Sequence, residues 1–150
     1  MAERTDISGA DRALRAAAVA FGAAAAFGTA IAIRDDLPGE PLGIHVPLTV
    51  PTGILVGWGG AVAAPWPMPV AALMAAFRSR SDDGGGWPAL VCAGLGISGI
   101  VGILIEPVTY KPRSWTPTTR AAVVLHVAGS AGLGATGLRC LKRARGHKTR

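Results

Sequence analysis

Charge is scarce in this chain, and it is almost absent from four long stretches. Charged residues make up 16% of the 150 residues, whereas soluble domains average about 25%. The stretches that carry almost no charge are residues 14–33, 41–77, 88–105 and 121–138. A soluble protein of this length does not need four such runs. An ordinary water-soluble domain is therefore not the interpretation that the sequence favours.

Cysteines and catalytic motifs are also few. Cys92 and Cys140 are the two cysteines, and their spacing fits neither C-x-x-C nor another metal-binding pattern. We interpret both as small apolar side chains. The sequence has no G-x-S-x-G or H-E-x-x-H motif, and the three glycines at 84–86 lack the lysine and Ser/Thr of a phosphate loop. Nothing here indicates an enzyme, and no cofactor can be named.

The apolar runs have the length that a bilayer requires. About 20 apolar residues in helical form cross a hydrocarbon core of roughly 30 Å. No polar stretch is long enough to form a second, soluble domain. The sequence therefore predicts one all-α membrane domain over residues 1–150, a bundle of four transmembrane helices at about 12–33, 52–77, 88–105 and 118–139, followed by a basic tail at 142–150.

Prolines shape the second run, which is too long for one straight span. Pro65, Pro67 and Pro69 remove three backbone donors within five residues, so we expect a break or kink there in the helix at 52–77. The piece after the break is too short to span alone, and it could turn along the membrane interface. Pro88 and Pro117 suit the first turns of the third and fourth helices.

The first apolar run has a rival interpretation as a secretory signal peptide, because Ala30-Ile31-Ala32 resembles a cleavage site. Two features favour a retained helix instead. The residues before the run include the acids Glu3, Asp6 and Asp11, and the run is longer than a usual signal core.

The net charge is +6 and the pI is near 10.4, and the positive residues cluster beside the apolar runs. No basic face with interleaved aromatics indicates nucleic acid, so we expect a lipid bilayer as the main partner. With four crossings, one side carries Arg34, Lys111, Arg113 and Arg120, and the other carries the remaining 11 of the 15 Lys and Arg residues. Loops rich in Lys and Arg stay in the cytoplasm. The sequence predicts a multi-pass protein of the cell membrane with both termini cytoplasmic.

Small residues recur at four-residue spacing in every span, which predicts smooth stripes for close helix packing. Such stripes can join helices of one chain, or join the chain to a second copy or another membrane protein. The alternative is that Gly and Ala are simply abundant. The residues predicted to pack are Gly22, Gly53, Gly57, Gly94, Ser98, Gly102 and Gly134.

His126 is the ionisable residue that lies well inside a span, and such residues are functional candidates. Histidine can ligate metal or haem, or carry protons near neutral pH. Glu106 and His45 are expected near the same membrane boundary, and a His–carboxylate pair could bind a divalent cation or relay a proton. The structural alternatives are a neutral His126 bonded to the backbone and an interfacial Glu106 near basic residues.

Three functions stay open at this point. The first is a structural or accessory membrane protein that acts through helix packing. The second is a small transporter or channel subunit that works as an oligomer. The third is a metal- or haem-binding membrane protein that uses His126.

Overall fold

The computed structural model describes residues 2–78, 86–111, 113 and 115–147. Within these residues the fold is all-α, with five α-helices, two short 3-10 helices and no sheet. The all-α prediction is confirmed, although Arg80 and the last three residues of the predicted basic tail lie outside the described residues. The elements are α1 (Ala2–Arg34), η1 (Pro41–Gly43), α2 (Val50–Val56), α3 (Pro67–Arg78), α4 (Gly86–Ile105), η2 (Pro107–Tyr110) and α5 (Pro117–His147).

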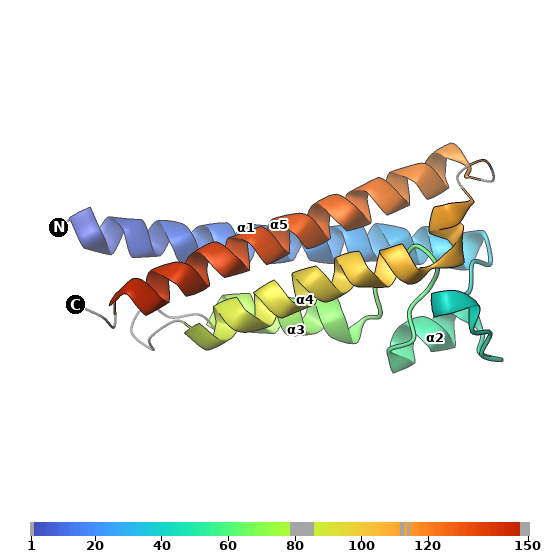
Figure 1. Ribbon diagram of the computed structural model, residues 1–150, viewed down its shortest axis with the longest axis horizontal. Coiled ribbons are helices and arrows are strands. Elements are labelled where there is room, and N and C mark those ends of the chain that lie inside the picture. Colours follow the sequence, from blue (N-terminus) through green and yellow to red (C-terminus); the bar gives the residue numbers. More distant parts are fainter. Residues whose placement is uncertain (1, 79–85, 112, 114, 148–150) are drawn as a thin grey trace.

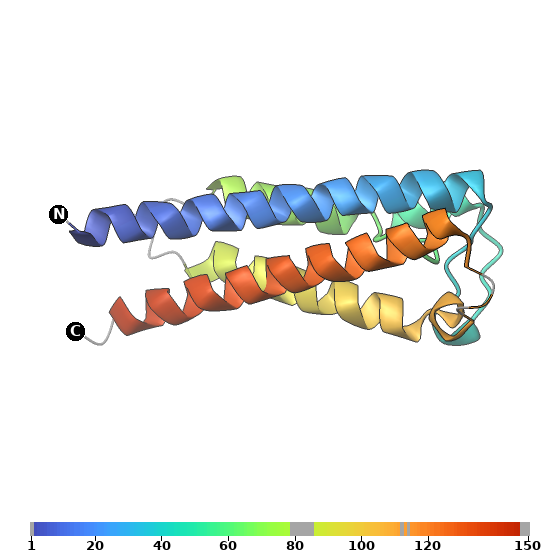
Figure 2. The same ribbon diagram turned by 90° about the horizontal axis from the view of Figure 1, so that it is seen from above.

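The helices form an elongated four-sided bundle in which α1, α4 and α5 run most of its length (Figures 1 and 2). α5 packs against both α1 and α4, and the shorter α3 closes the fourth side between α1 and α4. The two described chain ends lie at one end of the bundle, and α2 lies toward the other end. We call these the terminal end and the α2 end.

Three helices are long and apolar enough to cross a membrane: Gly9–Arg34 of α1, Gly86–Ile105 (α4) and Pro117–Gly146 of α5. Their most apolar windows reach mean hydropathies of 2.0, 2.2 and 1.5, yet only 33–39% of each window is buried inside the protein. Most of the apolar surface therefore faces outward, where a water-soluble bundle carries polar residues. This distribution supports contact with a lipid bilayer.

The second predicted helix, at 52–77, is broken as expected, but into two separate helices, α2 and α3, that a longer irregular segment joins. α2 ends at Gly57, whose φ of +99° is left-handed, and Gly59 also has a positive φ of +89°. Glycine adopts this conformation without the steric penalty of a Cβ, so it ends the helix. The chain is then non-helical until α3 begins at Pro67. The break begins at Gly57, which comes before Pro65, the first of the prolines at which it was predicted.

The prolines have a different role from the expected kink. Pro67 and Pro69 stand in the first turn of α3, where the backbone N–H groups have no partner within the helix and proline is tolerated. α3 does not lie apart from the bundle as an interfacial piece, because it packs against α1 and α4. The chain thus returns from the α2 end to the terminal end through a buried irregular segment and a short helix.

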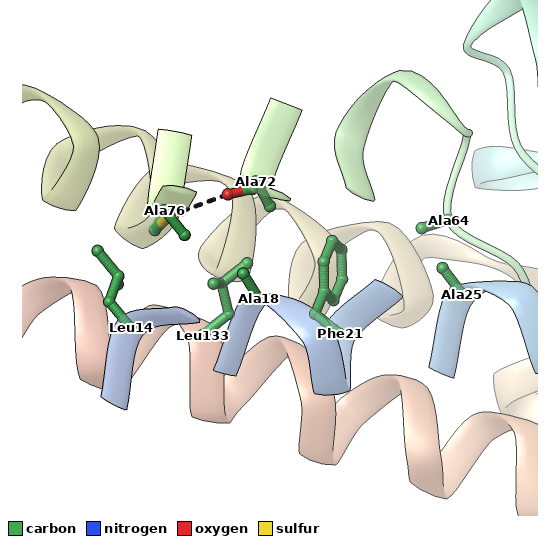
Figure 3. Packing of buried hydrophobic residues seen from close by; sticks show 9 residues of the cluster. Leu14, Ala18, Phe21, Ala25, Ala64, Ala72, Ala76 and Leu133 are labelled. Atoms are coloured by element: carbon green, nitrogen blue, oxygen red, sulfur yellow. Dashed lines mark hydrogen bonds between the residues drawn. The ribbon is translucent and has the colours of Figure 1, made fainter. Parts of the chain in front are cut away.

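Small side chains fill the interior. One cluster, toward the terminal end, is built around Leu14, Phe21 and Leu133, with alanines such as Ala18 and Ala72 between them (Figure 3). A second cluster toward the α2 end contains Ile31, Ala32, Val50, Ile54, Val62, Ala63, Ile103, Ala122 and Val123. Because most core residues are alanines, the helices approach closely, as they do in membrane bundles.

The start of α5 follows the sequence expectation. Thr116 Oγ1 accepts a hydrogen bond of 3.1 Å from the backbone N–H of Thr119, and Pro117 occupies the first helical position. This is a side-chain cap followed by a first-turn proline. At the same end Arg34 donates to Thr118 Oγ1 at 2.8 Å, which ties the end of α1 to the start of α5.

Candidate functional site

A cavity of about 260 Å³ lies between α4 and the irregular segment at 57–65. We call it the α4 cavity. Its wall runs from Glu106 and Pro41 at the α2 end to Ser98 on α4, and it reaches His126 on α5. Glu106 and Ser98 are about 12 Å apart along the helix at 1.5 Å per residue. The lining residues are Pro41, Gly57, Trp58, Gly59, Gly60, Ala61, Ala63, Ala64, Pro65, Met68, Ser98, Gly99, Gly102, Ile103, Ile105, Glu106 and His126.

The irregular segment can be buried because its backbone finds partners. Gly60 and Ala63 exchange two backbone hydrogen bonds of 3.1 Å, and Ala61 donates to the carbonyl of Leu37 at 3.3 Å. Trp66 donates to the carbonyl of Ile54 at 3.0 Å. A buried backbone N–H without a partner is costly, so these bonds let the chain leave helical geometry inside the bundle.

Glycines in two helices make room for this segment. A Cβ at Gly28 of α1 would come closer than 3.0 Å to the carbonyl oxygen of Val62, and one at Gly53 of α2 would lie 3.1 Å from that of Gly59. Trp58 closes the loop from the other side, because its indole Nε1 donates to the carbonyl of Gly39 at 2.8 Å. The α4 cavity is therefore framed by backbone that cannot easily collapse into it.

Glu106 is the carboxyl group of the cavity, and it is only 6% exposed. It follows the last residue of α4 and caps the 3-10 helix η2. Its Oε2 accepts a hydrogen bond of 3.0 Å from the backbone N–H of Glu40. Burial raises the pKa of Glu106 above its ordinary value, and the hydrogen bond from Glu40 opposes part of that rise.

His126 lies deeper, on α5, and is 4% exposed. Its ring meets Phe21 edge-on with centroids 6.3 Å apart, and it is hydrogen-bonded with the backbone of Gly99. Its Nδ1 is buried without a hydrogen-bond partner, and so is the Oγ of Ser130 one turn further along α5. Unpaired buried polar atoms are uncommon in proteins, and they can mark a functional position.

His45 is placed elsewhere. It lies in the loop after η1, and its Nδ1 is 2.9 Å from Oε1 of Glu40 in an exposed pair. His45 does not line the α4 cavity, whereas Glu106 and His126 both do. Among the described residues, no three His, Cys, Asp or Glu side chains are grouped closely enough to hold a metal ion. The three predicted residues therefore do not converge, although two of them share one cavity.

The predicted packing residues divide into three groups. Gly22 faces Leu73 of α3, Gly53 faces Gly59, and Gly134 lies against the backbone of Gly96, so these three stand at close contacts. Gly57 has a different role, because it ends α2 with a positive φ.

The series Gly94, Ser98 and Gly102 does not form the α4–α5 contact. A Cβ at Gly94 or Gly102 would meet nothing within 4 Å, and Ser98 is exposed. Their predicted packing role therefore stays a prediction, for a contact with a second copy or another membrane protein. Four-residue spacing could not select the right face, because α4 carries glycines on several faces.

The residues that do pack α4 on α5 are Gly96, Gly99, Ser130, Gly134 and Gly137. A Cβ at Gly96 would fall closer than 3.0 Å to backbone atoms of Gly134, and one at Gly137 would do the same at Ala93. A Cβ at Gly99 would reach the Oγ of Ser130. The run 94–99 also has the spacing G-x-G-x-x-G, but it lies inside α4 and follows no strand, so it lacks the context of a dinucleotide site.

The sequence interpretation did not single out Trp58 and the glycines around it as cavity residues. Their signal was present in Gly57, Gly59 and Gly60, three glycines in four residues that interrupt an apolar run. Isolated glycines lower the stability of a helix interior, and a cluster of them permits a turn.

No protein-family model, curated protein sequence or solved structure matches the chain. The class therefore rests on the fold itself. An all-α bundle with three candidate spans and an outward apolar surface indicates a multi-pass membrane protein in contact with a lipid bilayer.

Proposed function

We propose that the protein binds a small solute inside the membrane, as a small carrier or channel subunit. The observation that carries this proposal is the α4 cavity, in which a buried carboxyl and a buried imidazole, Glu106 and His126, line the same space beside a non-helical stretch. A purely structural bundle has no need of this combination, because unpaired polar groups in an apolar interior reduce stability.

The backbone of the cavity wall supports the same conclusion. Non-helical backbone at membrane depth is tolerated where it is buried in protein or lines a water-filled cavity. In transporters, interrupted helices near the bilayer midplane supply the groups that bind substrates and ions. The segment at 57–65 lines the α4 cavity, and its interruption is a feature of this kind.

The proposed topology has four crossings. α1, α4 and α5 make three, and the irregular segment with α3 makes the return between α1 and α4. Both termini are cytoplasmic in this proposal, in the cell membrane, because most Lys and Arg residues flank that side. The Glu106 end of the α4 cavity then faces the outside.

Water access to the cavity tests the proposal before any solute is known. Ser98 and Ile97 are adjacent on α4, at about 10 Å from its end at Ile105; Ser98 lines the cavity, and Ile97 is an exposed apolar residue outside it. In a background with Cys92→Ala and Cys140→Ala, we expect a membrane-impermeant maleimide to label Ser98→Cys but not Ile97→Cys in liposomes. A thiol in hydrocarbon does not ionise and stays unreactive.

Two results would contradict the proposal. Ser98→Cys could stay unlabelled in intact liposomes while it reacts fully in denaturant. Alternatively, both cysteines could react at the same rate, which would place Ile97 in water and remove the membrane frame itself.

A structural or accessory role through helix packing is the second candidate. The observation in its favour is that Gly94 is exposed on α4 with open space where a Cβ would be, and small residues let a neighbouring helix approach closely in lipid. If Gly94 contacts a second copy or another membrane protein, Gly94→Leu lowers the oligomer mass measured in nanodiscs, whereas Ile97→Leu leaves it unchanged. An unchanged mass for Gly94→Leu counts against this role.

A further inference from the structure

We propose that the α4 cavity takes a small primary ammonium ion with an apolar tail, and that Glu106 supplies the countercharge. This inference rests on the proposed solute-binding function and names the chemical class of the solute. It follows from the charge, the shape and the polar groups of the cavity, which are considered in turn.

Charge selects a cation. Glu106 is the one acidic residue among the described residues that line the cavity, and none of those residues is Lys or Arg. The chain as a whole carries a net charge of +6, so a carboxylate with no Lys or Arg in the same wall is a local exception. A buried carboxylate is stabilised by an opposite charge close to it, whereas an anionic solute would add repulsion.

Shape selects a small and elongated solute. A volume of about 260 Å³ is just below the usual range for ligand pockets, which begins at roughly 300 Å³. The wall between Glu106 and Ser98 is made of Gly99, Gly102 and Ile103 on one side. On the opposite side are Ala63 and Pro65 of the irregular segment and Met68 of α3. An amine with a charged head at Glu106 and an apolar tail along these residues matches this wall, because the side chains between the carboxyl and Ser98 are apolar.

The polar and aromatic groups fit the same class. Oε2 of Glu106 already accepts a hydrogen bond from Glu40, and a carboxylate has lone pairs left for an ammonium N–H. The Trp58 indole lines the cavity, and its own N–H is engaged by Gly39, so it is held in place. Aromatic rings attract ammonium groups through their quadrupole, and a carboxylate with an aromatic ring is a common setting for cation recognition.

The test compares two probes of equal size, benzylammonium and benzyl alcohol, on the purified full chain in phosphatidylcholine nanodiscs. Binding is measured by equilibrium dialysis with empty nanodiscs subtracted, at about pH 8, far above the ordinary carboxyl pKa of 4.5. We expect the wild-type protein to bind benzylammonium at least about tenfold more tightly than benzyl alcohol. Equal affinity for the two probes overturns the inference.

Three variants assign the site. Glu106→Gln keeps the shape and an acceptor for the Glu40 N–H, and we expect it to lose about tenfold in benzylammonium affinity with little change for benzyl alcohol. Asp36→Asn removes one carboxylate from the exposed loop at the same end, outside the cavity, and we expect no change. Gly102→Leu adds a large side chain at a residue that lines the cavity, where a Cβ meets nothing within 4 Å, and we expect it to abolish binding of both probes.

These experiments distinguish a failure of the ammonium assignment from a failure of the proposed solute-binding function. If wild type binds both probes equally and Gly102→Leu removes both, the cavity holds solutes but the ammonium assignment is wrong. If neither probe binds, the inference and the proposed function fail together. Should Glu106→Gln not fold, the comparison of the two probes on wild type still decides.

Lipid could be a second source of the same chemistry, because phosphatidylethanolamine carries a primary ammonium above apolar chains. Repeating the dialysis in nanodiscs that contain phosphatidylethanolamine distinguishes the sources. Weaker benzylammonium binding there supports the ammonium site and identifies the headgroup as an occupant, whereas unchanged binding supports a free amine.

Discussion

The backbone N–H of Glu40 donates a 3.0 Å hydrogen bond to Oε2 of Glu106, across 66 positions of the chain. The bond joins the loop after α1 to the end of α4 at the edge of the α4 cavity. It also fixes the orientation of the one carboxyl that lines this cavity among the described residues. The position of Glu106 is therefore set by a backbone group and by burial rather than by an ion pair.

Replacing Glu106 should separate its hydrogen bond from its charge. In Glu106→Ala the Glu40 N–H loses its acceptor, and a part-buried donor without a partner costs about 1–3 kcal/mol. In Glu106→Gln the side-chain carbonyl can still accept. We expect thermal unfolding in detergent to shift downward for Glu106→Ala, with Glu106→Gln at or above wild type. Equal midpoints for the two variants would show that the hydrogen bond does not contribute.

The raised pKa of Glu106 gives a pH dependence with a defined sign. A carboxyl whose pKa is higher in the folded state binds its proton more tightly there, so stability falls as the pH rises from the ordinary value of 4.5 through the folded value. We expect the unfolding midpoint of wild type to fall relative to Glu106→Gln across that interval.

The comparison of wild type with Glu106→Gln also controls for the ionisable groups near Glu106. Glu40 raises the pKa of Glu106 by its charge, His45 hydrogen-bonds Glu40, and His126 lines the same cavity. All three are present in both proteins, so their contributions cancel to first order in the difference. If that difference is flat or rises with pH, the direction assigned to Glu106 is wrong.

The α4–α5 contact predicts opposite outcomes for two glycines on one helix. Gly96→Ala brings a Cβ closer than 3.0 Å to backbone atoms of Gly134, and such overpacking costs typically about 1–3 kcal/mol. Gly94→Ala adds a Cβ in open space and gains up to about 1 kcal/mol of helix propensity. We expect a lower midpoint for Gly96→Ala and an unchanged or higher one for Gly94→Ala. The reverse order would mean that α4 is rotated about its axis.

Gly99 and Ser130 form a pair that a double-mutant cycle can test. A Cβ at Gly99 would collide with the Oγ of Ser130, and that hydroxyl is buried without a hydrogen-bond partner. We expect Gly99→Ala to destabilise the protein and Ser130→Ala to be neutral or stabilising, because it removes an unpaired polar group. In the Ser130→Ala background the cost of Gly99→Ala should shrink. Strict additivity would argue against direct contact.

Helix existence could be read from the sequence, because length and hydropathy act locally. The first, third and fourth predicted spans all fall within long helices, and the Thr116-Pro117 start of α5 was recognisable from residue types alone. The second span could not be predicted in the same way. Gly57 and Pro65 both disfavour a helix, and which of them ends the element depends on the partners that the freed backbone finds at Ile54 of α2 and at Leu37.

The sequence could indicate residues of the candidate site, but not how they are arranged. Glu106 and His126 stood out because ionisable residues are rare in apolar runs. His45 shares its residue type with His126 and its expected membrane boundary with Glu106, yet its loop turns it to the surface beside Glu40. Loop paths depend on long-range contacts that periodicity does not encode, so the sequence could not tell that two of these residues share a cavity and the third does not.

By itself, the sequence indicated contact with a lipid bilayer, because the length and hydropathy of its uncharged runs suit membrane-spanning helices. It determined the all-α class for the same reason, since backbone in lipid must satisfy its own hydrogen bonds. The tertiary structure alone decided which glycines meet across α4 and α5. It also decided where the chain leaves helical geometry between α2 and α3. It decided, too, that a cavity lies between α4 and the irregular segment, because these features arise from packing between segments far apart in the chain.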